Sequence, residues 1–224
     1  MADKLFSPVL SNEYQEKLKN KAIFEIRSLV GDLLFNSPPN YSNSKRFLHL
    51  GCGTIYLEGW VNADFYDGLL PWNKNKVKID WMQDFRKGLN CKDNYWQGVF
   101  SEHTLEHFYP WEALSLLKEV HRTMEKNAWL RIVVPDLALY IKFYISKKDK
   151  RFRKEWKLGS EAIWSIAQYW GHKSIWDSEL LAHFLLEAGF RNVKKAAFGR
   201  GTDRRIIKDQ LERRWESLYI EAQK

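Results

Sequence analysis

The chain has 224 residues, and its 45% hydrophobic and 29% charged residues are typical of a folded globular protein with a substantial core. Its two cysteines are too few for a disulfide framework, and no run of about 18 apolar residues is present that could form a transmembrane helix. The net charge of +8 favours an anionic partner, such as a nucleic acid, a phosphorylated glycan carrier or a membrane surface. The N-terminus lacks a signal-peptide pattern, so we expect a cytoplasmic protein.

The N-terminal region is predicted to be a helix followed by a loop. Residues 12–35 carry apolar side chains at helical spacing, with a polar opposite face. Residues 36–44 contain two prolines, three asparagines and three serines, which is typical of a loop. We therefore expect residues 1–45 to form a helical arm and linker, and residues 46–224 to form the main domain.

Seven segments of the main domain are predicted to be strands, because short apolar or β-branched runs recur there. They are 47–50, 60–65, 76–85, 96–103, 129–136, 193–199 and 217–224. Helical spacing predicts helices over 110–125 and 178–190, the second with Ser178 as its cap and Gly189 at its end. Residues 137–177 have a more irregular pattern. The alternation indicates an α/β fold, a Rossmann-like doubly wound, mostly parallel seven-stranded sheet with helices on both faces.

The most informative stretch is FLHLGCGTIYLEGWVNADF, residues 47–65. The first strand leads into Gly51-Cys52-Gly53, and Asp64 closes the second strand. Beyond the carboxyl ends of such strands, glycines let the backbone approach a ligand, and an acidic side chain can accept hydrogen bonds from ribose hydroxyls. The spacing is not G-x-G-x-x-G, so the usual pyrophosphate cradle is missing. The pattern favours a nucleoside cofactor without a pyrophosphate over NAD, and a purely structural turn is the alternative.

Several motifs in this order resemble the class I S-adenosylmethionine-dependent methyltransferases, and more narrowly their bacterial and viral branch associated with polysaccharide biosynthesis. They are LHLGCG, GWVNADF, QDFRKGL, SEHTLEHF, LLKEVHRTMEKNAWLRIVVPD and LLEAGF, within residues 46–224. The resemblance implies S-adenosylmethionine as the cofactor. It also implies contacts to the methionine part from Gly51, Cys52 and Gly53, to the ribose from Asp64, to adenine from Asp84 with Phe85, and below the methionine part from Ser101, Glu102 and His103.

The pentapeptide HTLEH, residues 103–107, matches the H-x-x-E-H spacing of an inverted zinc-protease motif. A zinc hydrolase would need a third protein ligand and a motif within a helix, but here the motif begins at the end of a predicted parallel strand. The zinc hydrolase is therefore the less favoured hypothesis. We expect His107 to start a helix or to line the substrate entrance. Because no cluster of carboxylates is evident, we expect no metal.

Methyl transfer to a hydroxyl needs a positioned acceptor and a group that takes its proton. His172, in the segment WGHKSIWD, is the favoured base, with Asp136 as its orienting partner or as an alternative base. Alternatively, Asp136 caps the following helix and His172 is an exposed loop residue. Trp170 and Trp176 are candidates for stacking against a sugar.

These features predict an O-methyltransferase that acts on a sugar hydroxyl of a glycan or glycan precursor. The alternative with the same cofactor is an RNA ribose methyltransferase, because the chain is basic and residues 142–157 combine Lys and Arg with aromatic residues. A third hypothesis is a binding protein with a methyltransferase fold and no activity.

Overall fold

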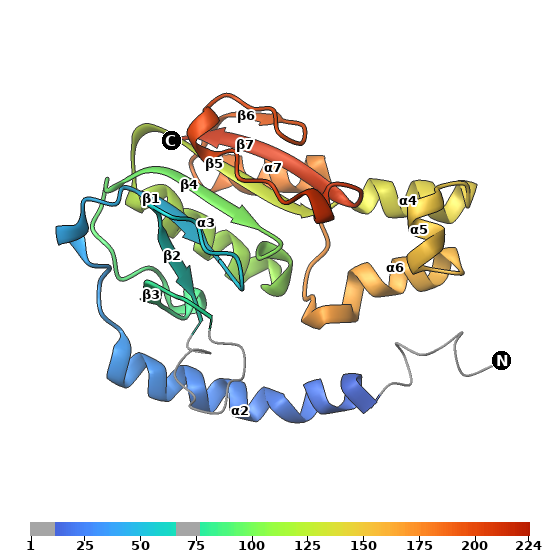
Figure 1. Ribbon diagram of the computed structural model, residues 1–224, viewed down its shortest axis with the longest axis horizontal. Coiled ribbons are helices and arrows are strands. Elements are labelled where there is room, and N and C mark those ends of the chain that lie inside the picture. The colour runs from blue at the N-terminus through green and yellow to red at the C-terminus, as the bar shows by residue number, and fades with distance from the viewer. Residues whose placement is uncertain (1–11, 66–76) are drawn as a thin grey trace.

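The computed structural model of the protein describes residues 12–65 and 77–224, so residues 1–11 of the expected arm and position 76 of the expected third strand lie outside it. Within these ranges, one sheet has the strand order β3-β2-β1-β4-β5-β7-β6 (Figure 1). The strands are β1 (Phe47–Leu50), β2 (Val61–Asp64), β3 (Trp81–Met82), β4 (Trp96–Glu102), β5 (Met124–Pro135), β6 (Arg191–Lys195) and β7 (Ser217–Gln223). Strand β7 is antiparallel to β5 and β6, and the other pairs are parallel. The predicted seven-stranded, mostly parallel sheet is confirmed.

The order of the strands reverses between β1 and β4, which pair in parallel in the middle of the sheet. The chain runs outward from β1 to β2 and β3, and then returns to place β4 on the other side of β1. The segments that follow β1 and β4 therefore meet at the same edge of the sheet. Ligands bind at such a switch point in doubly wound folds.

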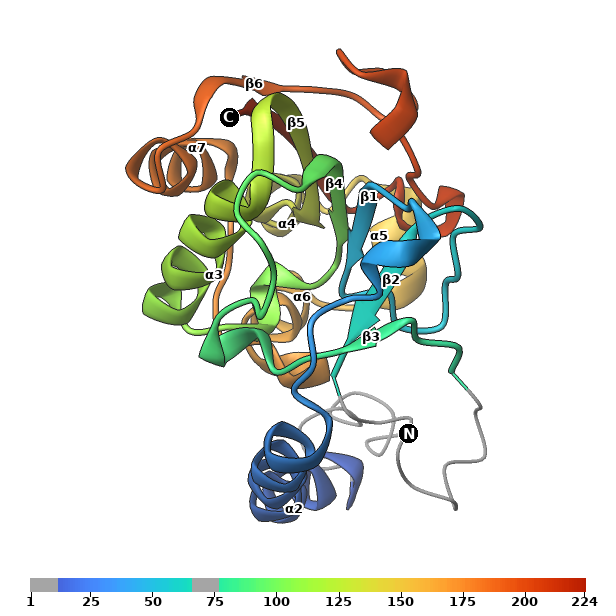
Figure 2. The ribbon, with the colours of Figure 1, turned by 90° about the vertical axis from the view of Figure 1, so that its left-hand side faces the viewer.

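One face of the sheet is covered by α3 (Pro110–Thr123) and α7 (Ser178–Glu187) (Figure 2). Helix α3 buries an apolar stripe against the main core, namely Ala113, Leu116, Leu117 and Val120. Helix α7 begins one residue earlier than its predicted cap suggests. Asp177 is the cap, because its side chain accepts the backbone N–H groups of Glu179 and Leu180 at 3.1 and 2.8 Å. Ser178 is the first helical residue.

The opposite face of the sheet carries a smaller aromatic core. Trp60, Phe100, Val133 and Tyr219 are buried there. Ile206, from the 3-10 turn Arg204–Ile206, covers them and is fully buried. The turn lies so close to β4 that position 98 has room only for a glycine, since a Cβ atom there would lie 2.5 Å from the Ile206 side chain.

Three helices occupy the region predicted to be irregular: α4 (Leu137–Ser146), α5 (Lys150–Glu155) and α6 (Gly159–Gln168). They extend beyond the carboxyl edge of the sheet (Figure 1) and enclose their own core of Tyr140, Phe143, Phe152, Trp156, Ala162 and Ile166. The prediction was wrong for these helices. Helix α4 is apolar almost all round, and α5 has only six residues, so neither has a clear amphipathic period.

The predicted N-terminal helix is confirmed as α2 (Asn12–Phe35), which runs along one side of the domain (Figure 1). Its apolar stripe is exposed, with Ile26 61% and Leu33 83% accessible. Contacts with the domain come instead from Phe24, Glu25 and Ser28. No helix in the described ranges is both long enough and apolar enough to cross a membrane.

Candidate functional site

The turn after β1 is shaped by two glycines in the left-handed region. Gly51 has φ 73° and Gly53 has φ 50°. The backbone N–H groups of Gly51 and Cys52 both donate to the carbonyl oxygen of Ala63 on β2, at 2.9 and 3.0 Å. At Gly51 there is no room for a side chain, because a Cβ atom would lie 2.1 Å from Oγ1 of Thr104. Thr104, which the sequence analysis missed, thus packs directly on the turn and donates to the Gly51 carbonyl at 3.3 Å.

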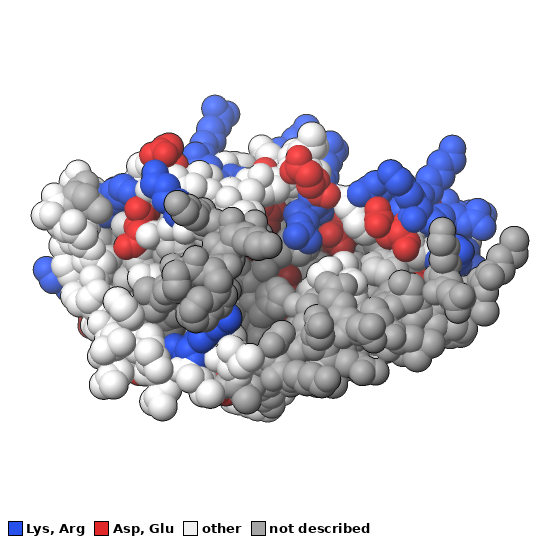
Figure 3. Space-filling view, turned by 60° about the horizontal axis from the view of Figure 1, so that its bottom comes forward, with Lys and Arg blue, Asp and Glu red and all other residues white. Residues whose placement is uncertain are grey.

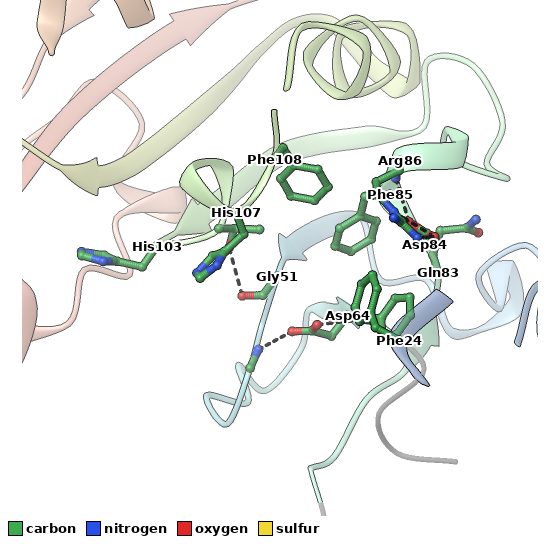
Figure 4. A pocket seen from close by; sticks show the side chains of 13 residues that line it. Phe24, Gly51, Asp64, Gln83, Asp84, Phe85, Arg86, His103, His107 and Phe108 are labelled. Atoms are coloured by element: carbon green, nitrogen blue, oxygen red, sulfur yellow. Dashed lines mark hydrogen bonds and ion pairs between the residues drawn. The ribbon is translucent and has the colours of Figure 1, made fainter. Parts of the chain in front are cut away.

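Asp64 links the end of β2 to the glycine turn. One carboxylate oxygen accepts the backbone N–H of Gly53 at 2.6 Å, and the other accepts the N–H of Phe65 at 2.7 Å (Figure 4). Both bonds hold the carboxylate against the wall of a cavity. A carboxylate has about four lone-pair sites and can accept several hydrogen bonds at once.

This cavity has a volume of about 410 Å³ and opens at the carboxyl edge of the sheet (Figure 4). It brings together seven of the predicted site residues: Gly51, Gly53, Asp64, Asp84, Phe85, His103 and His107. Six further residues that were not predicted as site residues complete its lining, namely Phe24, Phe65, Gln83, Arg86, Thr104 and Phe108. Phe24 comes from α2 and stacks on Phe65 with ring centroids 4.2 Å apart, so the N-terminal arm forms part of the wall.

Three predicted cofactor residues do not line the cavity. Cys52 is buried beneath the turn, where burial first and the charge of Asp64 second raise the pKa of its thiol to about 12. Ser101 is buried within β4. Glu102 accepts the backbone N–H of Gln210 at 3.2 Å, and burial raises its pKa to about 7.

Asp84 lies at the end of the cavity that is nearest to α2. Its carboxylate caps the turn Phe85–Lys87 and accepts hydrogen bonds from Arg86 and from the Ser28 hydroxyl. Arg86 continues to Glu25 of α2 at 2.7 Å. Burial acts to raise the pKa of Asp84, but the hydrogen bonds from Arg86 and Ser28 hold it below its ordinary value. This network fixes α2 to the domain beside the cavity.

The other end of the cavity is formed by HTLEH, which leaves β4 and makes a 3-10 turn over Leu105–His107. His103, Glu106 and His107 gather there with His172 from the segment after α6. Nδ1 of His103 lies 3.3 Å from Oε1 of Glu106, and Nε2 of His172 lies 4.0 Å from the same oxygen. The rings of His107 and His172 meet edge to face, 5.1 Å apart. We call these four residues the Glu106 cluster.

Backbone hydrogen bonds bring His172 to this place. The N–H groups of Lys173 and Ser174 both donate to the carbonyl oxygen of Glu106, at 2.8 and 3.1 Å. Burial lowers the pKa of His172, and the charge of Glu106 opposes this only in part. Burial also lowers the pKa of His107, and the charge of Glu106 again opposes this in part. Burial acts to raise the pKa of Glu106, but its histidine neighbours, His103 above all, keep it below its ordinary value.

The comparisons with known proteins point in one direction. The family described as "Methyltransferase domain" matches residues 14–195. The chain belongs to this family. It is a methyltransferase.

Solved structures agree with this fold. A SAM-dependent methyltransferase from Archaeoglobus fulgidus is 20% identical, with a TM-score of 0.50 over 94% of this chain and 100% of that chain. A SAM-dependent methyltransferase from Thermotoga maritima is 12% identical, with a TM-score of 0.51 over 99% of each chain. No curated protein matches the sequence.

The remaining predicted site residues of the methyltransferase lie outside the cavity lining. Asp136 caps α4 by accepting the N–H of Ala138 at 3.0 Å, as the alternative interpretation had it, and lies 3.9 Å from Nζ of Lys195. The carboxylate beside His172 is therefore Glu106 rather than Asp136. Trp176 is only 1% exposed and packs in the core, so it offers no face to a sugar. Trp170 is 44% exposed.

Proposed function

We propose that this methyltransferase is an S-adenosylmethionine-dependent O-methyltransferase that modifies a sugar hydroxyl of a glycan or glycan precursor. The observation that carries the proposal is the cavity that joins the glycine turn and Asp64 to His103 and His107. Its first end suits a nucleoside, and its second end offers imidazoles that can accept a proton from a hydroxyl. A methyl donor bound at the first end and a hydroxyl acceptor bound at the second end meet in the middle of the cavity.

S-adenosylmethionine is the methyl donor. The backbone of Gly51 and Gly53 runs along the methionine part, and Cys52, buried beneath the turn, makes no side-chain contact with it. At Gly53, where a Cβ atom would meet no other residue, the lack of a side chain allows close approach. Asp64 accepts hydrogen bonds from the ribose hydroxyls, and the adenine lies against Phe85. Both carboxylate oxygens of Asp84 accept hydrogen bonds from Arg86. Asp84 therefore acts on the adenine end of the cavity by positioning Arg86.

Ser101 and Glu102 have a different role in this arrangement from the one that the resemblance implied. Neither lines the cavity. The hydrogen bond between Glu102 and the backbone of Gln210 ties the end of β4 to the C-terminal segment. These two residues support the position of His103 instead of touching the cofactor.

The reaction is an in-line displacement at the methyl carbon. The acceptor oxygen forms a bond to that carbon while the carbon–sulfur bond breaks, and the electron pair of the broken bond stays on sulfur, which becomes a neutral thioether. The hydroxyl proton passes to an imidazole nitrogen of the Glu106 cluster. Alignment of the two reactants supplies much of the acceleration in such a reaction.

The acceptor approaches from the side of the Glu106 cluster. Trp170 lies there with its ring 5.7 Å from that of His172, next to Tyr169. Exposed aromatic rings beside a reactive group suit the apolar face of a sugar. Of the two predicted tryptophans, we therefore assign Trp170 and not Trp176 to the acceptor.

The test begins with calorimetric titration of the full chain with S-adenosylmethionine and S-adenosylhomocysteine. We expect both to bind, and transfer of a labelled methyl group to a panel of sugars and nucleotide sugars then identifies the acceptor. Trp170→Ala should raise KM for the acceptor and leave cofactor affinity unchanged, with the exposed Trp111→Ala on α3 as a matched control. Failure of well-folded protein to bind either compound would refute the proposal and favour the inactive-fold hypothesis.

A ribose hydroxyl of RNA is the second candidate acceptor, and a basic surface favours it. Figure 3 shows Lys and Arg side chains gathered at one end of the molecule. The exposed basic residues of the α4–α5 region are Lys142, Lys147, Lys148, Lys150, Arg151, Arg153, Lys154 and Lys157. RNA binding weakens steeply with salt because counterions are released, and binding of a neutral sugar does not. A strong salt dependence of acceptor binding would select RNA.

A further inference from the structure

Glu106 is a buried carboxylate without a hydrogen-bond donor. Its side chain is 2% exposed, and neither Oε1 nor Oε2 has a hydrogen-bond partner among the described residues. Its backbone carbonyl, in contrast, accepts two N–H groups, from Lys173 and Ser174. A buried ionised carboxylate is strongly destabilising unless a cation or several donors compensate it. A positive charge next to the Glu106 carboxylate would therefore stabilise it.

The imidazole of His172 presents an acceptor nitrogen to this carboxylate, not a donor. Its Nδ1 lies 2.8 Å from the backbone carbonyl oxygen of Ile166, which can only accept, so Nδ1 carries the proton. In the neutral ring, Nε2 then has a free lone pair, and it points toward Glu106 at 4.0 Å. A histidine whose far nitrogen donates to a backbone carbonyl is the usual arrangement of a metal ligand.

His103 shows the same mismatch. Its Nε2 lies 2.9 Å from Oγ of Ser217, and that hydroxyl already donates to the carbonyl oxygen of Arg213 at 2.6 Å. The imidazole must therefore donate from Nε2, which leaves the lone pair of Nδ1 facing the Glu106 carboxylate at 3.3 Å. Two acceptors face each other there, which is stable only with a positive charge in the cluster, either a metal ion or a second proton on His103.

We propose that Glu106, His107 and His172 bind a divalent transition-metal ion of which Zn²⁺ is the best match. One ligand atom from each residue lies within 4.8 Å of the other two. Two imidazole nitrogens and one carboxylate oxygen form a ligand set that suits Zn²⁺ and leaves a coordination position open. Bonds of about 2.0–2.2 Å would bring these atoms to about 3.4 Å apart, so side-chain movements of about 1 Å complete the site.

The role of the ion in catalysis rests on the proposed function, whereas its binding can be measured without methyl transfer. His107 lines the cavity, so an ion held by these three residues would lie at the cavity wall, where it could bind the acceptor hydroxyl. A hydroxyl bound to a divalent ion loses its proton more readily. His103, outside the ligand set, keeps Nδ1 for that proton. The motif thus contributes Glu106 and His107 to a metal site, with His172 as the third ligand and His103 as the proton acceptor.

The test is metal binding by the chelator-treated full chain, first with Zn²⁺ by calorimetry and then with Co²⁺ by its visible absorption. We expect one equivalent per chain, with Mg²⁺ much weaker because it prefers oxygen ligands. Glu106→Gln and His172→Asn should each weaken Zn²⁺ binding by more than the roughly 10–100-fold loss typical of outer partners. His183→Asn is the matched control, because His183 lies 3.9 Å from the Glu187 carboxylate but is exposed.

The outcomes separate the metal from its alternatives. Zn²⁺ binding that Glu106→Gln leaves unchanged, or no binding at all, would overturn the proposal and favour a second proton on His103. Thermal unfolding without metal checks that each variant is folded, so that a loss of Zn²⁺ binding is not caused by unfolding. Full methyl transfer after chelation would overturn the metal's role but leave the proposed function intact. Loss of S-adenosylmethionine binding would refute that function and leave the metal titration valid.

Discussion

Gly51 is the residue at which the structure makes the sharpest quantitative prediction. It has φ 73°, and a Cβ atom there would lie 2.1 Å from Oγ1 and 2.3 Å from Cγ2 of Thr104. Gly51→Ala therefore combines backbone strain with steric overlap. A left-handed conformation costs a residue with a side chain about 1–2 kcal/mol, and overpacking costs about 1–3 kcal/mol.

The expected loss is the sum of these two contributions, about 2–5 kcal/mol in the free energy of unfolding. For a chain of this size, that corresponds to a fall in Tm of about 10 °C. Urea denaturation followed by circular dichroism measures it directly. Calorimetry on the same variant should also show weaker S-adenosylmethionine binding, because the turn must shift to accommodate the methyl group.

Gly53→Ala is the matched control. Gly53 also has positive φ, 50°, but a Cβ atom there meets nothing within 4 Å. It should lose only the backbone part, about 1–2 kcal/mol. In a Thr104→Ala background, which removes the two closest contacts but keeps Cβ of residue 104 at 2.8 Å, the cost of Gly51→Ala should fall but stay above that of Gly53→Ala. Equal losses for the two glycine variants in the wild-type background would refute the steric argument.

Three further predictions concern the cofactor, pH and the core. Asp64→Asn removes the negative charge that we propose binds the ribose and replaces one acceptor oxygen with an NH2 donor, so S-adenosylmethionine should bind about 30- to 140-fold more weakly by calorimetry, a loss of about 2–3 kcal/mol. Burial lowers the pKa of His49 to about 4, so the folded state binds fewer protons and up to about 3 kcal/mol of stability should disappear as pH falls from about 6.5 to 4. Arg131 is fully buried between Asp209 and Glu221, and Arg131→Met should cost about 3–5 kcal/mol in urea denaturation because both carboxylates lose their partner.

Each of these predictions has a control. Glu58→Gln removes an exposed carboxylate outside the cavity, and a similar loss of cofactor affinity there would discredit the role of Asp64. His49→Gln should flatten the part of the pH profile assigned to His49, and an unchanged profile would contradict that assignment. A loss below about 1 kcal/mol for Arg131→Met would show that the two carboxylates take up protons or water instead.

Sequence periodicity predicted the sheet well, and α4–α6 poorly. The strands of the sheet's parallel half have short apolar runs between turns, and α3 has one apolar stripe, so local pattern and burial agree. Helix α4 packs in a satellite core with apolar residues on most sides, and its sequence LALYIKFYIS has no polar face to reveal it. The exposed stripe of α2 shows the reverse case, a clear period whose apolar side the described domain does not cover.

The candidate site divides in the same way. The turn at Gly51 and the carboxylate of Asp64 were predicted from adjacent residues, because a strand, a glycine turn and the next strand form one local unit. Thr104 gave no signal, because its role is to fill the space that a glycine leaves. Trp176 was expected at the acceptor because it lies near His172 in sequence, but its side chain points into the core.

The sequence by itself determined that β1 ends in a glycine turn and that HTLEH begins where β4 ends, since backbone conformation and strand ends depend on neighbouring residues. Only the tertiary structure decided which residues HTLEH lies beside. The segment after α6 returns to the sheet because Lys173 and Ser174 donate to the Glu106 carbonyl, and this brings His172 to the Glu106 carboxylate. Contacts between residues so far apart depend on how helices and sheet pack, which no local pattern encodes.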